Sequence, residues 1–201
     1  YSSTKCYQTV GVVGGGAGGV ELAFAINHRL QKSQGINPEK KIVLYSGNMG
    51  EKQGLEAVVY AADLMRGKTD LQFIMVGEGV VKANIEKLAN ELNLQNISFF
   101  PLLAYSMLPQ LLASADCHLV IQKKGAADAV LPSKLTNILA VGGNAVITAS
   151  SSTTLGILCG DFPDIAVLVE PESVEALITG IDRALSMPIP NQIAQKYAKD
   201  F

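Results

Sequence analysis

The sequence predicts an α/β domain in residues 39–201, a parallel sheet with helices on both faces, preceded by a glycine-rich βα segment and linker in residues 1–38. Two observations carry this prediction. From residue 41 onward, short β-branched runs alternate with segments whose apolar residues recur at helical spacing, which is typical of a parallel sheet between helices. In addition, 48% of the 201 residues are hydrophobic, which is enough to fill a substantial core.

Six segments have the length and composition of buried strands: residues 41–45, 71–76, 97–100, 117–121, 144–148 and 165–169. The first helix expected between them carries its apolar residues at positions i, i+3, i+4 and i+7, namely Leu55, Val58, Val59 and Ala62. Similar apolar stripes run through residues 85–92 and 174–181, and Ser173 is the expected N-cap of the latter helix. After a proline-containing break at residues 187–190, the spacing of Ile193, Tyr197 and Phe201 predicts a closing helix.

Charge and composition exclude several classes of partner. Nucleic acid is not expected, because the formal net charge is −2 and the pI is about 5.7, without the clustered basic residues that phosphate backbones require. No apolar run reaches the roughly 18 residues of a membrane span, so no transmembrane segment is expected. Cys6, Cys117 and Cys159 have neither metal-ligand spacing nor an even number for disulfides. We therefore expect no metal site and a cytoplasmic location, or the inner membrane surface for a longer protein.

Gly14, Gly16 and Gly19 form a glycine-rich turn between an expected strand, residues 9–13, and an expected helix, residues 20–31. Such a turn lets the backbone approach a pyrophosphate closely, as in dinucleotide sites. Those sites also use an acidic residue at the end of the next strand, where this chain has Tyr45 and Ser46. Residues 8–31 resemble the nicotinamide-binding βα unit of flavin-dependent pyridine-nucleotide oxidoreductases. Two interpretations stay open for this segment: a structural unit, or a site for NAD or FAD.

Three loops that follow expected strands contain the other candidate binding residues. The first loop contains Gly47, Asn48, Gly50 and Lys52, the second contains Gly77, Glu78 and Gly79, and the third contains Ser133, Lys134 and Asn137. Together these loops resemble the donor-binding loops of GT-B glycosyltransferases of the retaining family 4, especially the bacterial exopolysaccharide and colanic-acid-type enzymes. The resemblance runs from about residue 36 to residue 201.

This resemblance implies that the chain is the C-terminal, Rossmann-like half of a GT-B fold, which binds a nucleotide-sugar donor such as a UDP- or GDP-sugar. It implies hexosyl transfer in polysaccharide biosynthesis, with no cofactor beyond the donor. In this family an N-terminal domain of similar size binds the acceptor, and that domain is expected to be absent from this chain. We therefore expect the chain alone to bind the donor without appreciable transfer.

Elementary electrostatics predicts how these residues would bind a diphosphate. The ammonium groups of Lys52 and Lys134 neutralise phosphate charge, and the glycines of the first loop let the backbone come close. Glu78 is placed to contact the base or the ribose. The resembling family carries two glutamates eight positions apart, but here Asn137 stands where the second is expected and Asp128 lies one residue from the first position. Asn137 still donates and accepts hydrogen bonds toward ribose hydroxyls.

Two further features have more than one interpretation. His118 lies within an apolar strand and has no cluster of partner residues, so we expect it in the core rather than at a metal or catalytic site. Residues 151–154, Ser-Ser-Thr-Thr, either cap a short helix or add hydroxyl groups to the diphosphate pocket. The leading hypothesis is a glycosyltransferase donor domain. The competing hypotheses are an NAD- or FAD-binding module and a fragment whose sites are no longer used.

Overall fold

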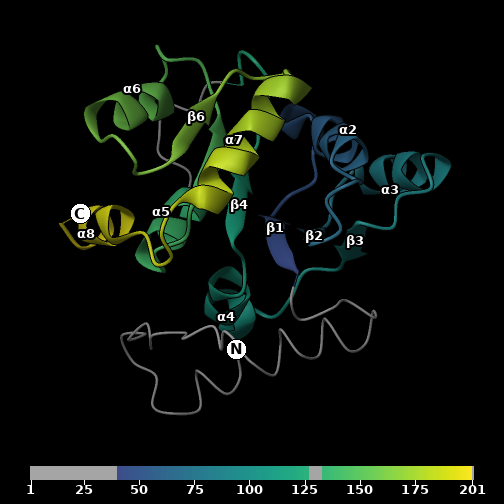
Figure 1. Cartoon of the computed structure of the whole chain (residues 1–201), viewed down its shortest axis with the longest axis horizontal. Coiled ribbons are helices and arrows are strands. Elements are labelled where there is room, and N and C mark those ends of the chain that lie inside the picture. Colours follow the sequence, from purple (N-terminus) through teal and green to yellow (C-terminus); the bar gives the residue numbers. More distant parts are fainter. Residues whose placement is uncertain (1–39, 127–132, 201) are drawn as a thin grey trace.

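The computed structural model describes residues 40–126 and 133–200 (Figure 1). The glycine-rich segment with Gly14, Gly16 and Gly19 lies outside the described residues, and so does Asp128. The described part contains a six-stranded sheet with the strand order β3-β2-β1-β4-β5-β6, in which every neighbouring pair is parallel. This arrangement confirms the predicted parallel α/β class.

The strands agree with the predicted segments to within two residues at each end. They are β1 (Lys41–Ser46), β2 (Leu71–Val76), β3 (Ile97–Phe100), β4 (Cys117–Val120), β5 (Ala145–Thr148) and β6 (Val167–Val169). Every residue of β2, β4 and β5 is buried. Such continuous apolar runs are what strands covered on both faces require.

Helices and 3-10 turns connect the strands. They are η1 (Glu51–Gln53), α2 (Glu56–Leu64), α3 (Lys82–Glu91), η2 (Tyr105–Met107), α4 (Leu108–Ala113), α5 (Ser133–Ala140), α6 (Thr154–Asp161), α7 (Val174–Ser186) and α8 (Gln192–Asp200). The hydroxyl of Ser173 accepts a hydrogen bond from the backbone N–H of Ala176 at 3.1 Å, which confirms the predicted N-cap of α7. The hydroxyl of Thr153 caps α6 in the same way, so a cap explains this residue of the Ser-Ser-Thr-Thr segment.

Alternate residues of the strands fill two separate cores. In β1, Val43 and Tyr45 face the core formed with α2, α3 and α7, whereas Ile42 and Leu44 face the core formed with α4, α5, α6 and α8. Figure 1 shows α7 crossing in front of β4, and the closing helix α8 packs against α5. The period-two alternation of a strand thus explains how one short segment supports both layers.

The chain reverses its winding direction between β1 and β4. From β1 the chain proceeds through α2 to β2 and β3 on one side of the sheet, and from β4 it proceeds to β5 and β6 on the other side. Because the two connections diverge, a crevice is left at the carboxyl ends of β1 and β4, where open α/β sheets bind ligands. The loops that carried the sequence-predicted binding residues meet at this edge.

Backbone hydrogen bonds join the loops that follow β1 and β2. The N–H of Gly47 donates to the carbonyl of Val76 at 2.9 Å, and the N–H of Met49 donates to the carbonyl of Glu78 at 2.8 Å. A Cβ atom on Gly77 would lie 2.0 Å from the carbonyl oxygen of Gly47. Glycine at position 77 is therefore what allows the two loops to touch backbone to backbone.

His118 of β4 is 1% exposed, as expected for a core residue. Its Nε2 atom has no hydrogen-bond partner among the described residues. Burial lowers the pKa of His118 from 6.5 to about 4, and a hydrogen bond with the backbone of Leu112 partly opposes this shift. The imidazole is therefore neutral in the folded protein near neutral pH.

We expect Gly77→Ala to destabilise the protein by roughly 2 kcal/mol or more, because the added methyl group forces the loop at Gly47 to move. Gly160→Ala in α6 is the matched control, since a Cβ there meets nothing within 4 Å. The control is expected to be neutral or to gain about 0.5–1 kcal/mol. Urea denaturation measures both, and equal midpoints for the two variants would contradict the packing argument.

We also expect stability to fall as the pH is lowered from 6.5 to 4. In this range an unfolded chain binds a proton at His118 and the folded protein does not, which removes roughly 3 kcal/mol from the free energy of unfolding. Urea titrations of the parent and of His118→Leu across this pH range isolate the effect, because carboxylates titrate in both proteins. A pH dependence that is equally steep in the two proteins would exclude a buried neutral His118.

Candidate functional site

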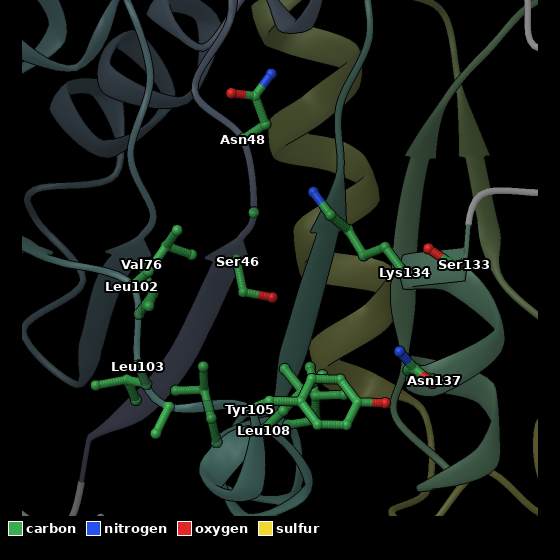
Figure 2. Close-up of a pocket in the computed structure, with 14 residues that line it drawn as sticks. Ser46, Asn48, Val76, Leu102, Leu103, Tyr105, Leu108, Ser133, Lys134 and Asn137 are labelled. Atoms are coloured by element: carbon green, nitrogen blue, oxygen red, sulfur yellow. The ribbon is translucent and has the colours of Figure 1, made fainter.

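A pocket of about 450 Å³ opens at the carboxyl ends of β1 and β2, beside the start of α5 (Figure 2). One wall is polar and is formed by Ser46, Gly47, Asn48, Ser133, Lys134 and Asn137. The other wall is apolar and comes from β2, the loop after β3, and α4, with Val76, Leu102, Leu103, Tyr105, Leu108 and Leu111. The pocket is therefore amphipathic, with its polar wall at the point where the winding direction of the sheet reverses.

Lys134, the second residue of α5, is the cation of the pocket. Its side chain is partly buried, and its Nζ lies 4.1 Å from the centroid of the Tyr45 ring. Burial lowers the pKa of Lys134 from 10.5 to about 8. In the part of the chain that the structure describes, the lysines that form ion pairs are Lys68, Lys82 and Lys87, so no carboxylate pairs with Lys134. Its ammonium is thus partly desolvated, and no described carboxylate compensates its charge.

Gly47 makes room for this ammonium. Its backbone has φ of +138°, a conformation that favours glycine, and a Cβ atom there would lie 2.9 Å from both Cε and Nζ of Lys134. Figure 2 shows the Lys134 side chain extending from α5 toward the loop that carries Asn48. The structure therefore brings Gly47, Asn48 and Lys134 together, although Asn48 and Lys134 are 86 positions apart in the sequence.

The first turn of α5 contributes the remaining polar groups. Ser133 begins the helix, and Asn137 lies about one turn further along, where its exposed side chain lines the pocket. The amino end of a helix carries unpaired N–H groups and a partial positive charge, both of which attract anions. Lys134 and the start of α5 therefore add positive potential to the same side of the pocket.

Five of the residues predicted from the sequence do not line this pocket: Gly50, Lys52, Gly77, Glu78 and Gly79. Lys52 is exposed on η1, where its carbonyl accepts the N–H of Lys123 at 2.8 Å. The carboxylate of Glu78 forms an ion pair with Lys82 at 2.8 Å. Gly50 donates its N–H to the side chain of Gln53, and Gly77 and Gly79 pack against the first loop. A ligand-binding role for these five residues stays a prediction.

The sequence analysis missed the apolar wall and Tyr45. Leu102 and Tyr105 are 60% and 84% exposed, and both line the pocket. The sequence signal that could have identified Leu102 and Tyr105 is their position shortly after an expected strand. Tyr45 is fully buried, and nothing in the strand pattern distinguishes it from an ordinary core residue.

Among residues 40–126 and 133–200, no group of three His, Cys, Asp or Glu side chains is arranged to hold a metal ion. None of the helices formed by these residues has the length and apolar character needed to cross a bilayer.

Known protein sequences resemble this chain over most of its length. The sequence profile of the family described as "Glycosyl transferases group 1" matches residues 27–201. A protein of Escherichia coli K12, provisionally named as the colanic acid biosynthesis glycosyl transferase WcaI, is 60% identical over 170 residues. This alignment covers 85% of the present chain and 42% of that protein, so the chain spans less than half of its relative's length.

Solved structures share the fold. WaaG, a glycosyltransferase involved in lipopolysaccharide biosynthesis, superimposes with a TM-score of 0.67 at 19% identity, covering 89% of this chain and 47% of WaaG. Anabaena Alr3699/HepE, solved in complex with UDP, superimposes with a TM-score of 0.70 at 15% identity, covering 90% of this chain and 50% of that protein. At such low identity these structures establish the architecture alone.

The fold, the match to the family profile and the identity to the E. coli protein agree with one another. They confirm the resemblance found in the three loops, and the profile begins at residue 27, after most of the segment that resembles an oxidoreductase. This chain belongs to the group 1 glycosyltransferases.

Proposed function

We propose that this chain binds the nucleotide-sugar donor of a retaining glycosyltransferase that acts in polysaccharide biosynthesis. The observation that carries the proposal is the ammonium of Lys134, which lines the pocket, has no carboxylate partner in residues 40–126 and 133–200, and is the charged side chain among the described residues that line it. Partly buried charges without a counter-ion are unfavourable in a free protein, and they are typical of sites that bind an opposite charge. The colanic acid name of the E. coli relative and the UDP bound in HepE support this proposal.

The two walls of the pocket suit the two parts of a sugar nucleotide. The wall of leucines and Tyr105 offers flat apolar surface to a nucleobase, and the wall with Lys134 and the start of α5 offers positive charge to a diphosphate. A volume of about 450 Å³ lies in the range of small-ligand sites, roughly 300–1,000 Å³. UDP- and GDP-sugars are both candidates, and the HepE complex favours UDP.

In sugar transfer, the bond between the anomeric carbon and the diphosphate oxygen breaks, and negative charge develops on the departing diphosphate. We infer that Lys134 and the helix start stabilise this charge, as fixed positive groups in a water-poor site do most effectively. Asn137 is placed to hydrogen-bond the donor ribose with its carboxamide, where the resembling enzymes use a glutamate. No cofactor beyond the donor is part of this proposal.

Transfer requires more than the groups in this pocket. The chain spans 42% of the E. coli relative and about half of the solved neighbours. We therefore propose that a second domain supplies the acceptor site and that this chain by itself binds the donor without transferring the sugar. A cytoplasmic location belongs to the same proposal, and the free thiols of Cys117 and Cys159 support it.

Isothermal titration calorimetry with UDP, UDP-glucose, GDP and GDP-mannose tests the binding proposal directly. We expect Lys134→Met to weaken binding by about 10- to 100-fold, the usual loss for one charge-assisted hydrogen bond. Lys196→Met on the exposed face of α8 is the control and is expected to change nothing. Lys52→Met tests the other predicted cation, with a smaller expected loss. Absence of heat with all four ligands would overturn the proposal.

Binding is also expected to depend on pH through Lys134. With a pKa of about 8, the protonated fraction falls roughly fourfold between pH 7 and pH 8.5, and affinity for UDP-glucose falls with it. Lys134→Arg keeps its charge over this range, so its affinity is expected to stay level. Calorimetry in two buffers of different ionisation enthalpy should show proton uptake on binding by the parent alone. An equal decline in both proteins would assign the pH dependence to another group.

A further inference from the structure

Tyr45 connects the two parts of the pocket's polar wall without lining the pocket itself. It is the fifth residue of β1 and is 0% exposed. The face of its ring lies under the ammonium of Lys134, with 4.1 Å between Nζ and the ring centroid. Its hydroxyl donates a hydrogen bond to the carbonyl oxygen of Asn48 at 2.5 Å. One buried side chain therefore contacts both the α5 side and the β1 loop of the site.

The ring stabilises the ammonium without neutralising it. A cation within about 6 Å of an aromatic centroid is attracted by the negative face of the ring, most strongly where water is excluded. A carboxylate in the same place would form an ion pair with Lys134 and would compete with an anionic ligand. Lys82 shows that alternative, because it is paired with Glu78 at 2.8 Å. Lys134 has no such carboxylate partner among the described residues, so its positive charge is left for a ligand while the ring partly compensates its desolvation.

The hydroxyl fixes the loop that faces Lys134. A buried phenol requires a hydrogen-bond partner, and here the partner is the backbone of Asn48, directly after Gly47. Burial raises the pKa of Tyr45 well above its usual value, so the phenol stays a neutral donor throughout the neutral and moderately alkaline range. One rigid side chain thus contacts the ammonium and adds a hydrogen bond to a loop that is also held by backbone hydrogen bonds from Gly47 and Met49.

We propose that Tyr45 is a positioning residue for the donor diphosphate: its ring holds the Lys134 ammonium and its hydroxyl holds the loop at Gly47 and Asn48. This inference rests on the proposed function, since it assigns Tyr45 a part in the same site. Tyr45 acts through these two groups and does not contact the ligand, in agreement with its absence from the pocket lining.

The test compares the parent chain with three replacements at position 45, using UDP-glucose as the probe. Tyr45→Phe keeps the ring and loses the hydroxyl, so a loss of affinity of about threefold or less is expected. Tyr45→Leu removes the ring as well, and about a tenfold loss is expected. A trifluorinated phenylalanine at position 45 keeps the shape of Phe but withdraws electrons from the ring. It is expected to bind more weakly than Tyr45→Phe, which is its matched control.

A double-substitution cycle separates positioning from general structural support. In the Lys134→Met background, Tyr45→Leu is expected to cost no more than the threefold loss expected for Tyr45→Phe in the parent, because the ammonium through which the ring acts is gone and only the hydroxyl contribution is left. In the unliganded protein, NMR titration of the Lys134 Nζ group should show a lower pKa with the trifluorinated ring than with Phe. If Tyr45→Leu does not fold, the comparison of the two isosteric rings still decides the matter.

The outcomes distinguish this inference from the proposed function. Failure of the parent chain to bind any sugar nucleotide overturns the proposed function, and the positioning role is rejected with it. Binding that is lost in Lys134→Met but is equal for the Phe and trifluorinated rings confirms the function and overturns the role of the Tyr45 ring. Equal effects of Tyr45→Leu with and without Lys134 likewise reject positioning through the ammonium.

Discussion

The site depends on the position of β1 at the middle of a parallel sheet. β1 pairs with β2 on one edge and with β4 on the other, and the chain winds away from it in both directions. The loops after β1 and β2 then share backbone hydrogen bonds, while α5, which follows β4, approaches from the other side. The crevice at the carboxyl ends of β1 and β4 is a consequence of this topology, and the side chains only determine what it binds.

Within that crevice, the protein maintains a charge that does not favour its own stability. The ammonium of Lys134 is partly buried against Tyr45 and meets no carboxylate among the described residues. Partial desolvation of the ammonium is unfavourable for folding. The two apolar cores that cover the faces of the sheet offset it. Under the function proposed above, the anionic donor compensates this charge when it binds, at some cost to the stability of the free protein.

The fold was predictable because its signals are local. The six strand segments and the apolar stripes of α2, α3 and α7 are patterns among residues close together in the chain, and the structure reproduces them with small shifts at the ends. The caps at Ser173 and Thr153 follow from the same local chemistry. The family resemblance likewise rests on short motifs within each of the three loops, and the comparisons confirmed the family.

The pocket itself was predictable only in part. Gly47, Asn48, Ser133, Lys134 and Asn137 were identified from their loops, and the structure brings all five to one wall. The apolar wall was not predicted from the sequence. Leu102 and Tyr105 follow β3, which is separated from β1 by β2, and neither carries a charged group that would suggest a phosphate site. Glu78 was also predicted to bind the donor; the structure pairs its carboxylate with Lys82, four positions further on, and its binding role stays a prediction.

The sequence by itself determined the order of strands and helices and the family, and it narrowed the candidate cations to Lys52 and Lys134, because periodicity and loop motifs are carried by neighbouring residues. Only the tertiary structure decided which of the loop residues meet. Gly77 packs closely against the backbone of Gly47, and the buried ring of Tyr45 lies 4.1 Å from the ammonium of Lys134. Such contacts depend on how distant segments pack around the sheet, and a linear pattern does not encode these distances.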